Sequence, residues 1–229
     1  MNKLTIIYED NDILICHKPA GIATQTKRLG QQDMESLLKN YRAKKGEPAN
    51  IWIVHRLDQP VEGIMVFAKN QKAAASVSKQ IQAHMIGKYY YMVSASMPQS
   101  SSGVLEDWML TDKKANISKI IESKEKNELP IDKQKEMKQA KLEYQVVDTK
   151  EEKTLLRVKL HTGRQHQIRV QMAHMGCPLV GDYKYGNGAG TEGLALCSYR
   201  LELEHPTSKK KLEFEIIPNG KAFHAFFPI

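Results

Sequence analysis

A short polar loop carries three reactive side-chain types within four residues. His55, Arg56 and Asp58 lie between two apolar stretches, residues 51–54 and 64–68, and the proline and glycine that follow favour a loop. An ionised carboxylate in a partly buried cleft can attack an electrophilic carbon or take up a proton, and a guanidinium within ~4–6 Å would keep it charged. The alternative is a solvated turn in which Arg56 and Asp58 form an ordinary surface ion pair.

A second group of charges gathers later in the chain. His161, Arg164, His166 and Arg169 lie in or beside residues 162–169, which lead into an expected helix. The positive end of a helix dipole disfavours cations, so this arrangement needs a carboxylate or phosphate partner. The alternative is an outward-facing basic helix that water solvates.

The elements that must position these residues follow from apolar alternation, helical periodicity and turn residues. Strands are expected at residues 4–8, 13–16, 51–54, 64–68, 89–93, 142–148, 154–160, 194–204 and 211–217. Helices are expected at residues 33–45, from a cap at Asn70 through Met85 to an end at Gly87, and through Ile168 to an end at Gly176. This pattern predicts an α+β fold with a mixed, mostly antiparallel β-sheet flanked by helices and loops.

One domain is expected to span residues 1–229, because no linker or internal repeat interrupts the pattern. Within it, residues 112–141 are rich in lysine and poor in apolar side chains, which predicts a long, exposed, mobile excursion.

The charge balance favours an anionic partner. The chain has 34 Lys and Arg against 26 Asp and Glu, a net charge of +8 and a pI near 9.2. Its three cysteines form no CxxC pair, which argues against a disulfide framework and a zinc knuckle. Early acidic residues and the lack of an apolar run of ~20 residues argue against a signal peptide and a membrane span. We therefore expect a cytoplasmic protein.

Six motifs, in order along the chain, resemble the signature sequences of the RluA-type pseudouridine synthase family. They are Lys18-Pro19-Ala20-Gly21, His55-Arg56-Leu57-Asp58 with Gly63 to Lys69, Lys88-Tyr89-Tyr90, Thr162 to Arg169, Val180-Gly181-Asp182 with Tyr185-Gly186, and Leu196 to Leu201 with His205-Pro206. Together they extend from the N-terminal strands to the C-terminal hairpin, so chance similarity is a poor explanation.

The resemblance implies an RNA-modifying isomerase with a pseudouridine-synthase catalytic domain. It implies that Asp58 is the catalytic carboxylate, that Tyr90 stacks on the target uracil, and that Arg164 pairs with Asp58. Contacts with the substrate are implied for a further set of residues, which are His55, Arg56, Lys88, His166, Arg169 and Leu196.

The chemistry of uridine isomerisation fits these residue types. The reaction breaks the N1–C1′ bond, turns the uracil, joins C5 to C1′ and releases the C5 proton, so it is redox-neutral and requires neither a cofactor nor a metal. The target base must be flipped out of its stack, and an aromatic face such as that of Tyr90 gives it a surface. The alternative for Tyr90 is a core or sheet-surface tyrosine. Basic side chains such as Lys69 could bind phosphates.

One pair of residues departs from the family pattern. Val61-Glu62 stands where most members have Thr-Ser before Gly63, which removes two hydroxyls close to Asp58 and adds a carboxylate. Two rival functions stay open. One is a hydrolase that uses Asp58 and Glu62 as a carboxylate pair, although this leaves the arginine and histidine cluster unexplained. The other is a catalytically inactive RNA-binding protein of the same fold.

The substrate and the remaining motifs complete the expectations. The motifs begin almost at the N-terminus, so we expect no N-terminal accessory RNA-binding domain and a monomer that reads a stem-loop of tRNA or rRNA mainly by shape. The string at residues 188–193 fits GxGxxG but leads into a strand, so it predicts a loop and no dinucleotide site. The three histidines His161, His166 and His174 match no zinc-ligand spacing.

Overall fold

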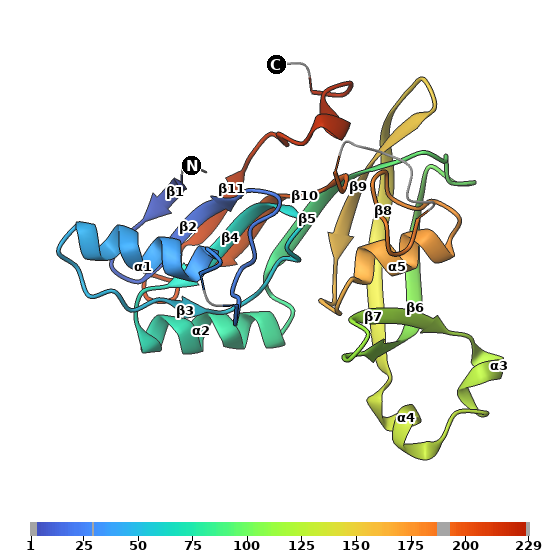
Figure 1. The fold of residues 1–229 in the computed structure, drawn as a ribbon, viewed down its shortest axis with the longest axis horizontal. Coiled ribbons are helices and arrows are strands. Elements are labelled where there is room, and N and C mark those ends of the chain that lie inside the picture. Colours follow the sequence, from blue (N-terminus) through green and yellow to red (C-terminus); the bar gives the residue numbers. More distant parts are fainter. Residues whose placement is uncertain (1–3, 29, 187–192, 228–229) are drawn as a thin grey trace. The chain divides into compact units, whose positions relative to one another are not determined.

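The computed structural model describes residues 4–28, 30–186 and 193–227 and contains two compact units (Figure 1). Unit 1 comprises Met1–Lys88 and Cys197–Pro218. Unit 2 comprises Tyr89–Leu196 and Asn219–Ile229. Each unit is therefore made from two separate stretches of chain, and the single domain expected over residues 1–229 stays a prediction. The GxGxxG string at residues 188–193 falls largely outside the described residues.

The described part of unit 1 is a sheet with two helices. Its strands lie in the order β1 (Thr5–Glu9), β2 (Ile13–Lys18), β4 (Glu62–Ala68) and β10 (Leu196–Glu204), with β3 (Trp52–Ile53) on β4 and β11 (Lys211–Glu215) on β10. The helices are α1 (Met34–Lys44) and α2 (Gln71–Gln82). These strand pairs are antiparallel except for β4 and β10, which are parallel.

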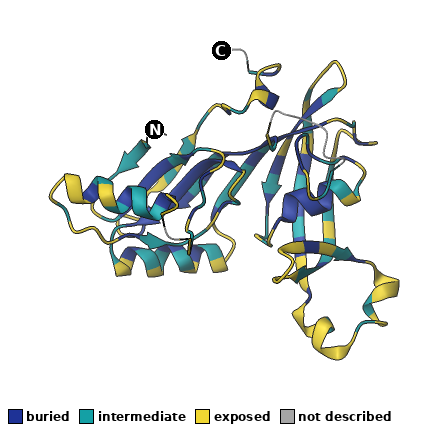
Figure 2. Ribbon diagram, in the orientation of Figure 1, coloured by how far each residue is buried: buried dark blue, intermediate teal, exposed yellow. Residues whose placement is uncertain are grey.

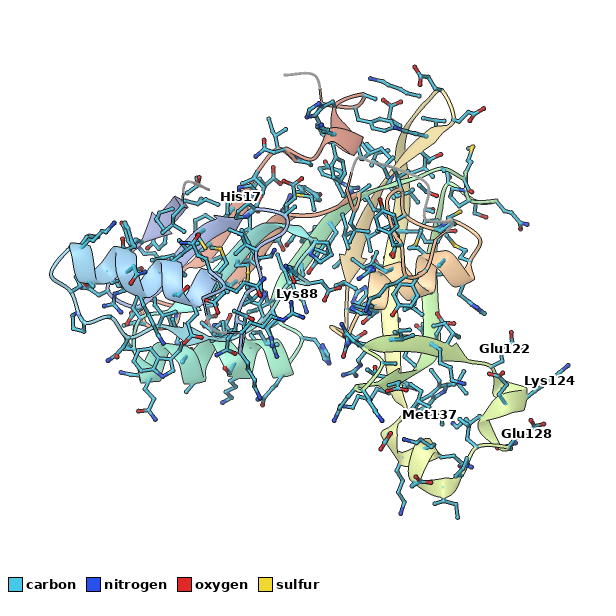
Figure 3. The ribbon with its side chains drawn as sticks, in the orientation of Figure 1. His17, Lys88, Glu122, Lys124, Glu128 and Met137 are labelled. Atoms are coloured by element: carbon cyan, nitrogen blue, oxygen red, sulfur yellow. The ribbon has the colours of Figure 1, made fainter. Side chains whose placement is uncertain are left out.

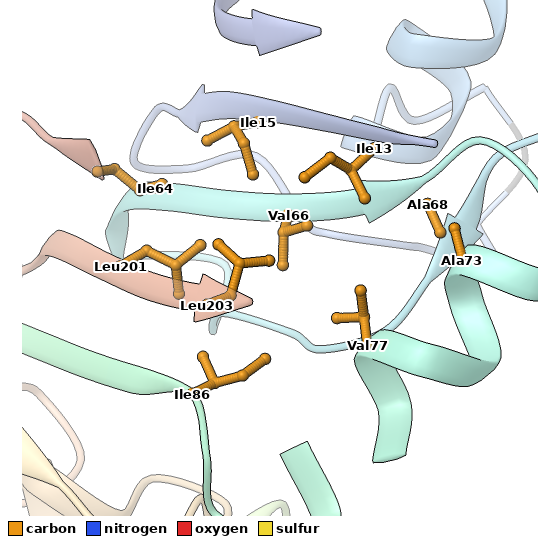
Figure 4. Close-up of a cluster of buried hydrophobic side chains, with 10 residues drawn as sticks. All are labelled: Ile13, Ile15, Ile64, Val66, Ala68, Ala73, Val77, Ile86, Leu201 and Leu203. Carbon is orange, nitrogen blue, oxygen red and sulfur yellow. The ribbon is translucent and has the colours of Figure 1, made fainter. Parts of the chain in front are cut away.

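The core of unit 1 lies on one face of β2 and β4. Alternate residues of the two strands, Ile13 and Ile15 with Ile64 and Val66, pack with Val77 of α2 in a buried cluster (Figure 4). Burying each such side chain contributes about 1.5–3 kcal/mol. This packing fixes β4, whose first residue follows the polar loop directly.

Helix α2 begins as predicted and ends earlier than predicted. The Asn70 side chain accepts a hydrogen bond from the Ala73 amide at 2.8 Å, which confirms the predicted cap. The helix ends at Gln82, and the residue with a left-handed backbone is His84, at φ 56°. Gly87 instead begins strand β5, so the predicted end at Gly87 was wrong. Histidine tolerates the left-handed region better than most residues, and apolar periodicity alone does not register it.

The described part of unit 2 is an antiparallel sheet with one longer helix. Its strands lie in the order β5 (Gly87–Ser94), β9 (Lys153–Leu160), β8 (Lys138–Lys150), β6 (Ser102–Asp112) and β7 (Ile117–Ile121). The helices are α3 (Ser123–Lys126), α4 (Ile131–Glu136), α5 (Gln167–His174) and the 3₁₀ turn η1 (Lys221–Phe223). The predicted α+β class and mixed, mostly antiparallel sheet are confirmed, although β6 and β7 were not anticipated.

The lysine-rich residues 112–141 form β7, α3, α4 and the start of β8. Most of their side chains are exposed, as predicted (Figure 2). Ile121, Met137 and Ala140 are nevertheless buried, and the Lys126 ammonium lies 4.1 Å from the centre of the Trp108 ring. The segment therefore has secondary structure and apolar anchors, and its mobility stays a prediction.

The longest of the described helices, α2, has 12 residues. A membrane-spanning helix needs ~20 apolar residues. Within residues 4–28, 30–186 and 193–227, no helix has the length and apolar character that a membrane span requires.

Candidate active site

The polar loop between β3 and β4 is held by its backbone. The amide of Val61 donates to the carbonyl of Asp58 at 3.0 Å, which closes a turn. The Thr24 hydroxyl donates to the carbonyl of Leu57 at 3.1 Å, and it accepts from the Leu57 amide at 3.2 Å. Because Leu57 directly precedes Asp58, this double contact fixes the main chain from which the Asp58 side chain extends.

A buried lysine holds the same loop from β2. Lys18 is fully buried, and its Nζ donates to the carbonyls of Pro19 at 3.1 Å, Ile22 at 2.7 Å and Gln59 at 3.1 Å. Burial lowers the pKa of Lys18 to about 8, although the nearby charge of Asp58 acts in the opposite direction. Sequence reasoning quoted Lys18 only as part of a motif. The available signal was a lysine that ends an apolar strand, where a charge needs several partners.

The side chains of the loop differ in exposure. Leu57 is buried, Asp58 is partly exposed and Arg56 is exposed. The loop thus presents a carboxylate and a guanidinium from a backbone that is fixed by hydrogen bonds. Chemically, this geometry suits a carboxylate that must reach a bound substrate.

His55 is held in the fold by one of its ring nitrogens. Its Nε2 accepts a hydrogen bond from the Val66 amide of β4 at 3.0 Å, so this nitrogen carries no proton. Burial, and then the charge of Lys88, lowers the pKa of His55 to about 4. Lys88 itself is partly buried (Figure 3). His55 therefore supports β4, and the substrate contacts expected of His55 and Lys88 stay predictions.

Tyr90 lies in unit 2 on β5, where it pairs with Val158 of β9. It is 7% exposed, whereas its neighbours Tyr89 and Tyr91 are partly exposed. The Tyr91 ring lies 5.1 Å from that of Phe227. The alternation expected of three consecutive strand tyrosines is present, and stacking of Tyr90 on a uracil stays a prediction.

The segment before α5 is tied together by Gln167. The Oε1 of Gln167 accepts from the Thr162 hydroxyl at 2.8 Å and from the Arg164 amide at 3.0 Å. The Arg164 Nε donates to the carbonyl of Gln139 at 2.8 Å. His166 takes a left-handed backbone at φ 55° and its Nδ1 lies 2.7 Å from the Tyr185 hydroxyl. These contacts hold the motif segment in a defined shape.

Two cations of this segment have carboxylate partners in unit 2. Arg169 is 5% exposed, and its Nε and Nη2 each donate to Asp182 at 2.7 Å. Burial would raise the pKa of Asp182, but the hydrogen bonds and charge of Arg169 lower it below its usual value. His161 lies 2.7 Å from Glu143. The need for anion partners is thus met by protein carboxylates, and the burial of Arg169 disfavours its predicted contact with RNA.

Lys69 is also engaged within the fold. Its Nζ lies 2.7 Å from Glu9 and 3.2 Å from Glu47, with a side chain that is 7% exposed. This ion-pair group accounts for Lys69 and disfavours a phosphate contact.

The expected site residues are divided between the two units. Unit 1 holds His55, Arg56, Asp58 and Lys88, and unit 2 holds Tyr90, Arg164, His166, Arg169 and Leu196. Leu196 is the first residue of β10 and is 4% exposed. Each half is ordered by its own unit, and the pairing of Asp58 with Arg164 stays a prediction. Among the described residues, no three His, Cys, Asp or Glu side chains gather as a metal site would require.

Comparison with known proteins identifies the family. The model described as RNA pseudouridylate synthase matches residues 12–174. The chain is 33% identical over 231 residues to the ribosomal large subunit pseudouridine synthase D of Pseudomonas aeruginosa, covering 93% of this chain and 68% of that protein. It is 32% identical over 207 residues to the dual-specificity RNA pseudouridine synthase RluA of Vibrio vulnificus, covering 89% and 78%.

A solved structure shares the fold. The human RNA pseudouridylate synthase domain containing 4 aligns with a TM-score of 0.75 at 20% identity, covering 94% of this chain and 89% of that one. The chain belongs to the RNA pseudouridylate synthase family, and within it to the RluA type. Its activity is that of an RNA pseudouridine synthase, an isomerase whose substrate is RNA.

Proposed function

We propose that Asp58 is the nucleophilic or basic carboxylate with which this chain isomerises specific uridines in structured RNA. The observation that carries the proposal is the clamped loop, in which Thr24 and Lys18 bind the backbone on both sides of Asp58 while its side chain stays partly exposed. A carboxylate held in this way reaches a substrate atom with little loss of conformational entropy.

The remaining roles follow from the chemistry of the step. Tyr90 gives the flipped uracil an aromatic face, and Arg164 acts as the guanidinium that keeps Asp58 ionised. Arg56, which is exposed beside Asp58, helps to displace the base from its stack. Replacing the N1–C1′ bond by a C5–C1′ bond involves no net oxidation or reduction, so the reaction needs no electron donor or acceptor beyond these side chains.

The substitution Asp58→Asn tests the proposal. We expect it to reduce isomerisation by a thousandfold or more, roughly the scale seen when an essential catalytic group is removed, while RNA binding is retained. Release of tritium from RNA labelled at uridine C5 measures the reaction, and a gel shift with the same RNA measures binding. Asp132→Asn, at an exposed position of α4, is the matched control and is expected to leave both unchanged.

The result also separates the rival functions. An inactive RNA-binding protein would show no isomerisation in the wild type and no change on substitution. The hydrolase alternative needs Glu62 as a second reactive carboxylate, yet Glu62 is 5% exposed and lies 3.6 Å from His17. Buried carboxylates of this kind are poorly placed to receive a substrate.

The RNA itself is proposed to be a stem-loop of tRNA or rRNA. Mapping of pseudouridine in cellular RNA with and without this protein identifies the uridine. Loss of a modification at one or a few defined positions supports the proposal, and unchanged maps of both tRNA and rRNA contradict it.

A further inference from the structure

His17 and Glu62 lie on the same face of the unit 1 sheet. The register of β2 and β4 pairs His17 with Ile64, and Glu62 lies two residues before Ile64 on β4. Side chains two residues apart on a strand share a face, so His17 and Glu62 are diagonal cross-strand neighbours. The same face carries the apolar cluster of Ile13, Ile15 and Val66 (Figure 4). An imidazole and a carboxylate thus end an otherwise apolar stripe.

This pair is buried. The side chains of His17 and Glu62 are 14% and 6% exposed, and His17 Nε2 lies 3.6 Å from Glu62 Oε2 (His17 is labelled in Figure 3). His17 Nε2 has no hydrogen-bond partner among the described residues. A buried carboxylate is strongly unfavourable without a nearby positive charge, and a protonated His17 supplies one.

Glu62 is connected to the catalytic loop through the chain and through Lys18. The residue before it, Val61, donates its amide to the Asp58 carbonyl. Lys18 follows His17 on β2, holds the Gln59 carbonyl, and is influenced by the charges of both Asp58 and Glu62. The carboxylate at position 62 therefore draws on the same ammonium that supports the Asp58 loop.

We propose that His17 and Glu62 are a matched pair of positioning residues for the reaction. His17 neutralises Glu62, so that the Lys18 ammonium stays directed at the loop that carries Asp58. The pair also accounts for the carboxylate found where the family pattern has a small hydroxyl residue, since the added charge is balanced by an imidazole on the adjacent strand. This inference rests on the proposed role of Asp58.

A double-mutant cycle tests the coupling. His17→Gln removes the imidazole charge beside Glu62 and is expected to lower kcat by about tenfold at saturating RNA with KM unchanged, within the range of coupling measured for contacting residues. Glu62→Gln is expected to have a smaller effect. The double variant His17→Gln with Glu62→Gln restores neutrality and is expected to recover most of the kcat that His17→Gln loses.

Glu35→Gln provides the matched control, because it breaks a more exposed ion pair, Glu35 with Lys39, in the same unit. We expect no change in kcat from it. All variants are assayed below the onset of their thermal unfolding, and Glu62→Asp replaces Glu62→Gln if the latter does not fold. Retention of the charge in Glu62→Asp should then preserve more activity than His17→Gln does.

Two outcomes would overturn the inference while leaving the proposed function intact. One is a wild-type kcat in both single variants. The other is a double variant whose loss equals the product of the two single losses. In contrast, a wild type with no isomerase activity, or an active Asp58→Asn variant, would contradict the proposed function itself.

Discussion

The two charged motif segments satisfy their polar groups in different ways. In residues 161–169 of unit 2, side chains meet side chains: His161 contacts Glu143, and the buried Arg169 forms two hydrogen bonds with Asp182. Most of this charge is used to hold the segment against its own unit.

In the loop of unit 1, the backbone supplies the partners. His55 accepts a backbone amide of β4, Thr24 binds both polar groups of the Leu57 backbone, and Lys18 binds the Gln59 carbonyl. The main chain is thereby fixed while Asp58 keeps a partly exposed side chain. The comparison teaches that a family motif can contain mostly scaffold residues in one region and a displayed reactive group in another.

Breaking the side-chain region should cause the largest loss of stability. Asp182→Asn removes the carboxylate charge that the buried Arg169 guanidinium binds, which is expected to lower the free energy of unfolding by about 3–5 kcal/mol. Urea unfolding at neutral pH measures it. Glu136→Gln breaks the exposed pair with Lys133 and should change stability by no more than about 0.5 kcal/mol. Equal losses in the two variants would contradict the scaffold role of Arg169.

The backbone region should respond to pH through His55. Its pKa is about 4 in the folded chain against 6.5 ordinarily, so the unfolded state binds the proton more tightly. The stability that this difference provides is complete above pH 6.5 and is lost as pH falls towards 4, by about 3 kcal/mol at most, at 1.36 kcal/mol per pKa unit.

His55→Gln isolates this effect, because the glutamine oxygen can accept the Val66 amide without titrating. We expect the variant to lose less stability than the wild type between pH 6.5 and 4, as measured by urea unfolding at each pH. Parallel losses in the two proteins would show that His55 titrates normally.

A smaller effect is expected where the loop backbone is held by Thr24. Thr24→Val keeps the side-chain shape but leaves the amide and carbonyl of Leu57 without the hydroxyl that binds them, at a cost of about 1–3 kcal/mol. It should also lower kcat, because Asp58 follows directly. Thr24→Ser retains the hydroxyl and should preserve kcat. A Thr24→Val enzyme with unchanged kcat and stability would separate Asp58 from this clamp.

Elements with a local signal were predictable from the sequence. The Asn70 cap, the antiparallel β8 and β9, and the C-terminal hairpin of β10 and β11 follow from capping residues and apolar alternation. Strand β6 was missed although burial alternates along its first half, because the serines and other polar residues near its start resemble a loop.

The candidate site was predictable only in part. Asp58 stands out because a charge between two apolar stretches is unusual, and the six motifs identify the reaction class. The roles of Lys18, His17 and Asp182 were not foreseen. Lys18 and Gln59 are 41 residues apart, and Arg169 and Asp182 are 13 apart, so no local pattern links them.

By itself, the sequence determined the family, the reaction class and the identity of the carboxylate proposed to react, since these depend on residue types in a fixed order. Only the tertiary structure decided which polar groups serve as scaffold and which side chains remain exposed. The physical reason is that hydrogen bonds and ion pairs require atoms within about 3–4 Å, and the folding of distant segments, rather than their order in the chain, sets those distances.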